Sequence, residues 1–185
     1  MRRRLFIATT LGMAVTTMCA ASASLAKRIA IIASTSDGSV PNSDLQRFIA
    51  RLGHGILEHP SCELLSRTRL DSVLQEQGFS NSAYADPSTA AKLGKIIGAS
   101  HILHATLTID TERSSGLMEH EKFQASSDFE LIEVSTARII STGSADGSQE
   151  RSAAGGGMLP GSMSEVRRGA VDDCAENLVS QLALN

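Results

Sequence analysis

The chain has 185 residues, with 17 Lys and Arg against 20 Asp and Glu, and its formal net charge is −3. This length fits one domain behind a leader segment. A mildly acidic chain with one Tyr and no Trp lacks the clustered cations that phosphate binding requires, so nucleic acid is not expected as a partner.

The N-terminus has the pattern of a secretory signal peptide. Three arginines follow Met1, an apolar run extends to Val15, and small residues come next. Cleavage after Ala23 and cleavage after Ala26 both fit the small-residue rule, so we expect a leader at 1–26 and an exported domain at 27–185. The apolar run is shorter than the roughly 20 residues that a spanning helix needs. No membrane-spanning segment is therefore expected once the leader is removed; a buried N-terminal helix is the alternative interpretation.

The three cysteines raise two questions. Cys19 is a lipid-attachment candidate, although Met18 stands where a lipobox has a small residue, and ordinary cleavage would remove both. Cys62 and Cys174 remain in the domain, and export to an oxidising compartment permits a disulfide between them. The alternative is that both are small buried hydrophobic residues that never meet.

The first part of the domain predicts strand, helix and strand. The β-branched run Lys27–Ala33 is typical of a central strand. Asn42 or Ser43 is expected to cap a helix that ends before Pro60, because the residue before proline disfavours helix. A second strand is expected at Cys62–Leu65.

Two helices follow. The first runs from a cap at Thr68 to Gly78, whose flexibility suits the left-handed residue after a helix. The second has Asp86 as its cap and Pro87 at its first position, and Gly98 ends it.

The second part of the domain predicts three strands and a last helix. Its apolar residues alternate in the strands and recur at helical spacing after the capping box that starts at Ser162. The expected segments are strand 100–110, charged loop or hairpin tip 111–122, strand 123–134, turn 135–137, strand 138–145, flexible Gly-rich loop 146–161, and the helix. The order β-α-β-α-α-β-β-β-α predicts an α+β fold, an α/β sandwich with helices on one or both faces of a mixed sheet.

No catalytic, cofactor or metal site is predicted. His101 and His104 are three apart on a predicted strand, so they point to opposite faces and cannot share an ion. The segment 143–147 imitates the Gly-x-Ser-x-Gly elbow of serine hydrolases but is interpreted as a turn. Arg67 and Glu76 are expected to hold the fold rather than to perform chemistry.

The two middle helices carry a resemblance to the CsgG family. This family groups curli secretion lipoproteins with outer-membrane lipoprotein activators of penicillin-binding proteins. Its pattern is an Arg-x-x-Leu-x-x-x-Leu-x-Glu-Gln helix, a Gly-Lys-x-x-Gly-Ala helix end, and a Val-x-x-Gly-Glu hairpin turn. The matching residues here are Arg67, Leu70, Leu74, Glu76, Gln77, Gly94, Gly98 and Val134. Ala137 and Arg138 stand where the family has Gly and Glu, and Ser100 where it has Asp.

The resemblance implies a periplasmic domain of cell-envelope assembly. Curli secretion members donate two β-hairpins to a shared outer-membrane barrel, and the matching insertions here are 110–122 and 148–162. The first is crowded with charges and the second consists of small residues, so neither has the apolar alternation that faces lipid. We therefore expect a non-enzymatic interaction domain that is not itself a pore and that binds envelope proteins or itself. Activation of a peptidoglycan synthase is the alternative, and a serine hydrolase is a distant one.

Overall fold

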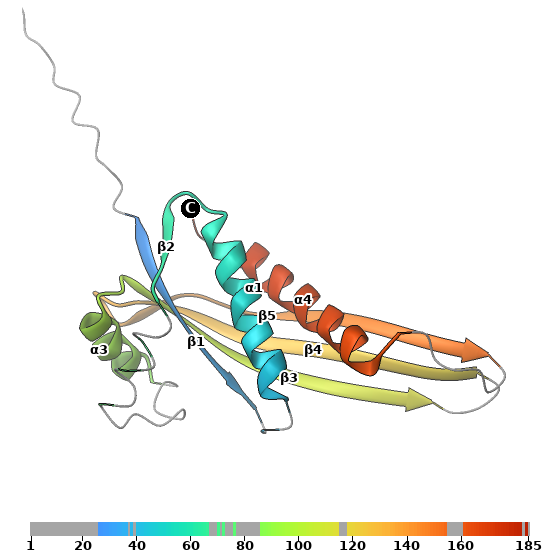
Figure 1. Ribbon diagram of the computed structural model, residues 1–185. Helices are drawn as coiled ribbons and strands as arrows, with labels where there is room; N and C mark the ends of the chain where they lie inside the picture. Colours follow the sequence, from blue (N-terminus) through green and yellow to red (C-terminus); the bar gives the residue numbers. More distant parts are fainter. Residues whose placement is uncertain are drawn as a thin grey trace, which may run out of the picture.

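The computed structural model describes residues 26–36, 38, 40–66, 70, 72, 76, 86–114, 118–154, 161–182 and 184. A long twisted sheet forms its centre, with α1 and α4 side by side across one face and α3 on the other face near one end (Figure 1). The predicted α+β class, with a mixed sheet and helices on both faces, is confirmed.

The sheet has the strand order β2-β1-β3-β4-β5. The strand β1 pairs in parallel with both β2 and β3, whereas β3, β4 and β5 form an antiparallel meander. The strands are β1 (Lys27–Thr35), β2 (Cys62–Leu64), β3 (His101–Ser114), β4 (Met118–Glu133) and β5 (Arg138–Ala154).

Helix α1 (Asn42–Leu57) lies where it was expected, but its predicted cap is wrong. Neither Asn42 nor Ser43 is the capping residue. Pro41 holds that position, and its carbonyl accepts hydrogen bonds from the backbone N–H groups of Asp44 and Leu45. The Asn42 side chain instead accepts a bond from Gln46, one turn along the helix.

Helix α3 (Pro87–Ile97) confirms both predicted ends. The Asp86 carboxylate accepts hydrogen bonds from the backbone N–H and the hydroxyl of Thr89, at 3.0 and 2.9 Å. Gly98 ends the helix with a φ of 79°, a left-handed conformation that a side chain would strain. The preceding predicted helix lies mostly outside the described residues. Leu70, Ser72 and Glu76 are helical there, and Leu70 is buried.

The three meander strands are longer than the sequence indicated. Of the two expectations for 111–122, the loop is wrong and the hairpin is right, because β3 continues to Ser114, β4 begins at Met118, and the two strands pair antiparallel. The predicted flexible loop is wrong over 146–154, which belong to β5, and the supposed turn at 143–147 is also strand; residues 155–160 lie outside the described part. These strands were not predicted because their side chains are charged or small. Such side chains stabilise β-structure through cross-strand pairs rather than through apolar burial.

Two apolar cores flank the sheet. The larger lies under α1 and α4 (Met163–Gln181) and includes Phe48, Phe123 and Phe129; the smaller lies under α3 and includes Ile102 and Ile132. Ser162 caps α4, as the capping box predicted, by accepting the N–H of Glu165 at 3.1 Å. No helix in the described part of the chain has the length and apolar character needed to cross a membrane.

Candidate interaction surface

Among the residues that the structure describes, one face of the meander is largely uncovered. Successive residues of a strand point to opposite faces, and those opposite the α1–α4 core point away from both helices. Because α3 covers only the first residues of β3, the remaining side chains form an open surface. We call it the polar face: Thr106, Thr108, Asp110, Glu112, Lys122, Gln124, Ser126, Asp128, Glu130, Thr142, Ser144, Asp146, Ser148 and Glu150.

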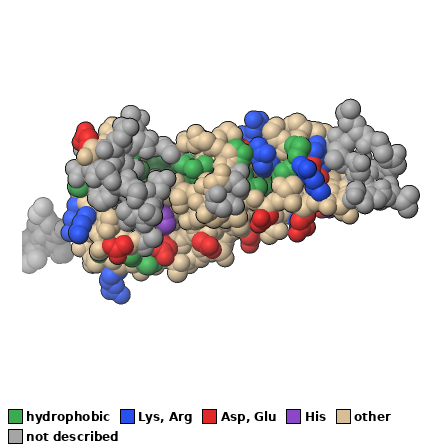
Figure 2. Space-filling model, turned by 90° about the horizontal axis from the view of Figure 1, so that it is seen from below, with side chains coloured by type: hydrophobic (Ala, Val, Ile, Leu, Met, Phe, Trp, Pro, Cys, Tyr) green, Lys and Arg blue, Asp and Glu red, His purple; other side chains and the backbone are tan. Residues whose placement is uncertain are grey.

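The polar face carries an excess of negative charge. Its cross-strand rows each contain a carboxylate, and Lys122 is its single lysine or arginine. In Figure 2 acidic side chains recur along the length of the molecule on the side seen there. Six carboxylates arranged in register favour a basic partner and disfavour a polyanionic one. The six are Asp110, Glu112, Asp128, Glu130, Asp146 and Glu150.

A pocket of about 420 Å³ opens on this face. His104, Asp128, Glu130 and Ser144 are among its lining residues. Burial lowers the pKa of the His104 imidazole, and the nearby Glu130 carboxylate opposes that shift only in part. His104 is therefore neutral at pH 7 and can both donate and accept a hydrogen bond.

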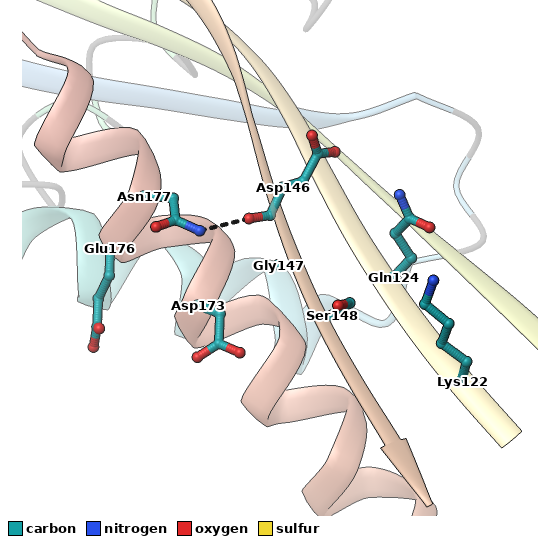
Figure 3. Close-up of a pocket in the computed structure, with 8 residues that line it drawn as sticks. All are labelled: Lys122, Gln124, Asp146, Gly147, Ser148, Asp173, Glu176 and Asn177. Carbon is teal, nitrogen blue, oxygen red and sulfur yellow. Dashed lines mark hydrogen bonds between the residues drawn. The ribbon is translucent and has the colours of Figure 1, made fainter.

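A second pocket, of about 390 Å³, lies where the polar face meets the outer edge of β5 (Figure 3). Lys122 and Gln124 approach it from β4, and Asp173 and Asn177 from α4. The Asn177 side-chain amide donates to the main-chain carbonyl of Asp146 at 2.7 Å. A bond to a backbone carbonyl of an edge strand occupies a group that would otherwise be open to another chain.

A third pocket, of about 680 Å³, lies between the C-terminal ends of α1 and α4. Arg51, His54, Glu58, His59 and Glu176 line it. The His54 ring nitrogen is 3.4 Å from the Glu58 carboxylate, and both side chains are largely exposed.

The described residues offer little support for a metal site or for a catalytic nucleophile. They contain no group of three His, Cys, Asp or Glu side chains that could hold a metal ion. Ser100 Oγ lies 2.9 Å from the His101 ring. However, the Ser100 hydroxyl also accepts a hydrogen bond from the backbone N–H of Arg28 and donates one to the Arg28 carbonyl. It therefore links the start of β3 to β1.

The two domain cysteines are free thiols in the structure. Cys174 is buried and its Sγ donates to the carbonyl of Ala145 at 3.3 Å. Burial, assisted by the charge of Asp146, raises the pKa of this thiol to about 12, so it is an unreactive core residue. Cys62 is half-buried at the start of β2. Cys19 lies outside the described residues.

Most residues of the family pattern that the structure describes serve packing or helix capping. A Cβ on Gly94 would overlap the methyl groups of Val134, so this glycine lets α3 lie directly on the sheet. Gly98 supplies the left-handed cap, and Leu70 belongs to the smaller core. Glu76 is exposed. The expected structural role of Arg67 stays a prediction, since Arg67, Leu74 and Gln77 lie outside the described residues.

Sequence reasoning missed the polar face and a buried ionic cluster around Glu121. The cluster and the outer part of the polar face lie in segments interpreted as loops. The available signal was the alternation of Phe123, Ala125, Phe129 and Leu131, which can be extended backward by two residues to Glu121. A carboxylate at an inward-facing position interrupts an apolar pattern, and this is why the extension was not made.

The chain was compared with curated proteins and with solved structures. No curated protein matches the chain significantly. Among solved structures, lipoprotein GNA1162 from Neisseria meningitidis is 17% identical with a TM-score of 0.47, over 66% of this chain and 83% of that one. The LpoB C-terminal domain from Salmonella enterica is 16% identical with a TM-score of 0.43, over 68% and 85%. A minor lipoprotein from Acinetobacter baumannii is 11% identical with a TM-score of 0.48, over 84% and 91%.

The family comparison covers most of the domain. The family described as "Curli production assembly/transport component CsgG" matches residues 61–184, from the start of β2 to the end of the described chain. The match includes both middle helices, the whole meander and α4. The chain therefore belongs to the CsgG family.

Proposed function

We propose that this chain is a non-enzymatic periplasmic interaction domain of cell-envelope assembly, which docks a basic envelope protein on its polar face. The observation that carries the proposal is the open, in-register acidic surface of β3, β4 and β5. Membership of the CsgG family and the secretory pattern at the N-terminus support the compartment. The proposed domain is not itself a pore.

The shape of the polar face suits docking. Its Ser and Thr hydroxyls supply donors and acceptors on a rigid sheet, whereas its carboxylates select the charge of the partner. The edge strand β5 borders this face, so a partner can bind side chains on the face and backbone groups at the edge together. The carboxylates would then determine which partner binds, and the backbone groups at the edge would determine how tightly it binds.

Site-specific photo-cross-linking in cells tests the proposal. A photoreactive residue at Ser144, on the polar face, is expected to form an adduct with an envelope protein. The same residue at Glu58, at the far end of α1, serves as a matched exposed control. Reversal of two charges, Asp128→Lys with Asp146→Lys, is expected to abolish the Ser144 adduct, whereas Glu58→Lys leaves it intact.

The result that would overturn this function is equally concrete. If no position on the polar face yields an adduct, and the charge-reversed variant supports envelope integrity as well as the parent, the face is not a docking surface. An adduct between two copies of the chain, accompanied by a dimer in light scattering, would identify self-association as the interaction.

The alternative function is activation of a peptidoglycan synthase. Its support is the likeness of the two middle helices to the family that includes activators of penicillin-binding proteins. A glycan-polymerisation assay with a purified synthase, with and without this protein, tests it. The charge-reversed variant is the control, because an activator that acts through the polar face would lose its effect with those substitutions.

A further inference from the structure

Three charged residues form one cross-strand row near the far end of the meander. Arg113 of β3 lies directly opposite Glu121 of β4, and Glu121 lies directly opposite Arg151 of β5. Arg113 Nε donates to one carboxylate oxygen at 2.6 Å. Arg151 Nε donates to the other at 2.7 Å, and its terminal nitrogen makes a further bond to the same oxygen.

This row lies on the helix-covered face but at its margin. Glu121 is two residues beyond the buried Phe123, and it is 3% exposed. The arginines cover it, and they also reach the start of α4. Arg151 donates to the carbonyl of Gly161 at 2.8 Å, and Arg113 lies 3.9 Å from the sulfur of Met163. The three residues thus join three strands and a helix terminus.

The apolar pattern alone leaves the alignment of this part of the meander weakly determined. A shift of two residues between antiparallel strands keeps every side chain on its own face, so facial polarity does not oppose it. The rows beyond Phe123 consist mainly of charged and small residues, with one His and one Met, and such residues discriminate little between alignments.

The charged row does oppose such a shift. A two-residue shift of β3 toward the far end of the meander would place Thr111 opposite Glu121, and a corresponding shift of β5 would place Gln149 there. Glu121 would then keep its buried position without a cation. A buried carboxylate without its counter-charge is strongly unfavourable, whereas a satisfied one specifies a unique arrangement.

We infer that Arg113, Glu121 and Arg151 are a register lock: they fix the alignment of the outer parts of β3, β4 and β5 and attach the start of α4 to it. The lock acts because a shift of either outer strand removes one arginine from the buried carboxylate, and a shift of both leaves it unpaired. Its role does not depend on which partner the polar face binds.

Disulfide trapping tests the lock directly. In a background with Cys62→Ala and Cys174→Ala, the pair Asp110→Cys with Gln124→Cys reports the native alignment, since these residues are opposite each other on the exposed face. Asp110→Cys with Lys122→Cys, and Asp110→Cys with Ser126→Cys, report shifts of two residues in either direction. In the parent background we expect the native pair to cross-link and both shifted pairs to remain reduced.

Glu121→Gln is expected to change this result. The shifted pairs become oxidised, and amide hydrogen exchange in residues 110–114 and 148–154 accelerates while β1 stays protected. Arg113→Gln, at a more exposed position, is a second variant in case the first does not fold, and a gain of shifted cross-links is expected there too.

The matched control is Asp44→Asn. Asp44 is likewise a buried carboxylate, and its arginine partner is Arg167. This pair joins α1 to α4, so it takes no part in the alignment of the strands. It should lower stability without producing shifted cross-links. If Glu121→Gln and Arg113→Gln behave as this control does, the row is an ordinary stabilising ion cluster and the register lock is refuted.

Discussion

Ala137 adopts a backbone conformation that its side chain disfavours. It is the non-glycine residue with positive φ in the described part of the chain, at 56°, and it lies in the turn between β4 and β5. The family pattern has glycine at this position. A left-handed residue with a Cβ costs roughly 1–2 kcal/mol, so the turn is strained in this chain.

Ala137→Gly should therefore stabilise the protein. We expect the free energy of unfolding to rise by roughly 0.5–1 kcal/mol, since the added flexibility of the unfolded chain offsets part of the relief. Urea denaturation measures the change. Ala50→Gly, on the exposed side of α1, is the control and should lower stability by roughly 1 kcal/mol. If both substitutions changed the free energy of unfolding in the same direction, the turn at Ala137 would not be strained.

Gly94 is subject to the opposite constraint, because it needs space rather than flexibility. Gly94→Ala should destabilise by roughly 1–3 kcal/mol through overlap with Val134, despite the better helix propensity of alanine. The double variant with Val134→Ala removes the overlapping methyl groups. A double-mutant cycle in denaturant should show that the two changes are not additive; simple additivity would mean that α3 does not rest on this contact.

Ionic contacts join α1 to α4 at the level of whole elements. Arg167 Nε donates to the buried Asp44 carboxylate at 2.5 Å. One turn further along each helix, the Asp172 carboxylate accepts from Arg47 Nε at 2.7 Å and from Arg51 at 3.0 Å. The two helices therefore cover the larger core as one layer.

These two carboxylates should differ in energetic weight. Asp44→Asn should lower the free energy of unfolding by roughly 3 kcal/mol, because it leaves Arg167 without its counter-charge at a buried site. Asp172→Asn should cost roughly 1 kcal/mol or less, because its arginines are partly exposed and can turn to solvent. Denaturant titration compares them. Equal losses would show that burial of Asp44 does not decide the outcome.

Elements with a local signal were predictable from the sequence. The cap and glycine of α3, the capping box of α4 and the strand β1 were predicted correctly because neighbouring residues determine them. The outer parts of β3, β4 and β5 were missed because partners in other strands determine them. Arg113 and Arg151 give Glu121 its place in a strand, and no window of sequence contains all three. The polar face was missed for the same reason.

At the scale of the whole molecule, two carboxylates paired with arginines make stability depend on pH. Burial alone would raise the pKa values of Glu121 and Asp172, but hydrogen bonds from their arginine partners outweigh it and lower both pKa values. The folded state therefore binds fewer protons than the unfolded state. The stabilisation is present above the unfolded pKa of roughly 4 and is lost as the pH falls through the lower folded values.

We expect the urea midpoint to be flat near neutral pH and to fall steadily below about pH 4. Glu121→Gln should be less stable at neutral pH and should lose part of this acid dependence, since its side chain no longer titrates. Equilibrium unfolding monitored by circular dichroism across the pH range provides the measurement. An identical acid slope in parent and variant would show that Glu121 does not contribute to it.

The strand order also sets a sequence of events during folding. The meander strands are joined by short turns, whereas the contact of Arg28 with Ser100 closes a loop of 72 residues. Closing a long loop is entropically slower than forming a hairpin, so β1 should join the sheet after the meander exists. Mutations in β1, such as Ile31→Val, should then accelerate unfolding and leave the folding rate nearly unchanged. The strand β1, which is the first strand of the described residues, would thus be the last to be placed in the sheet.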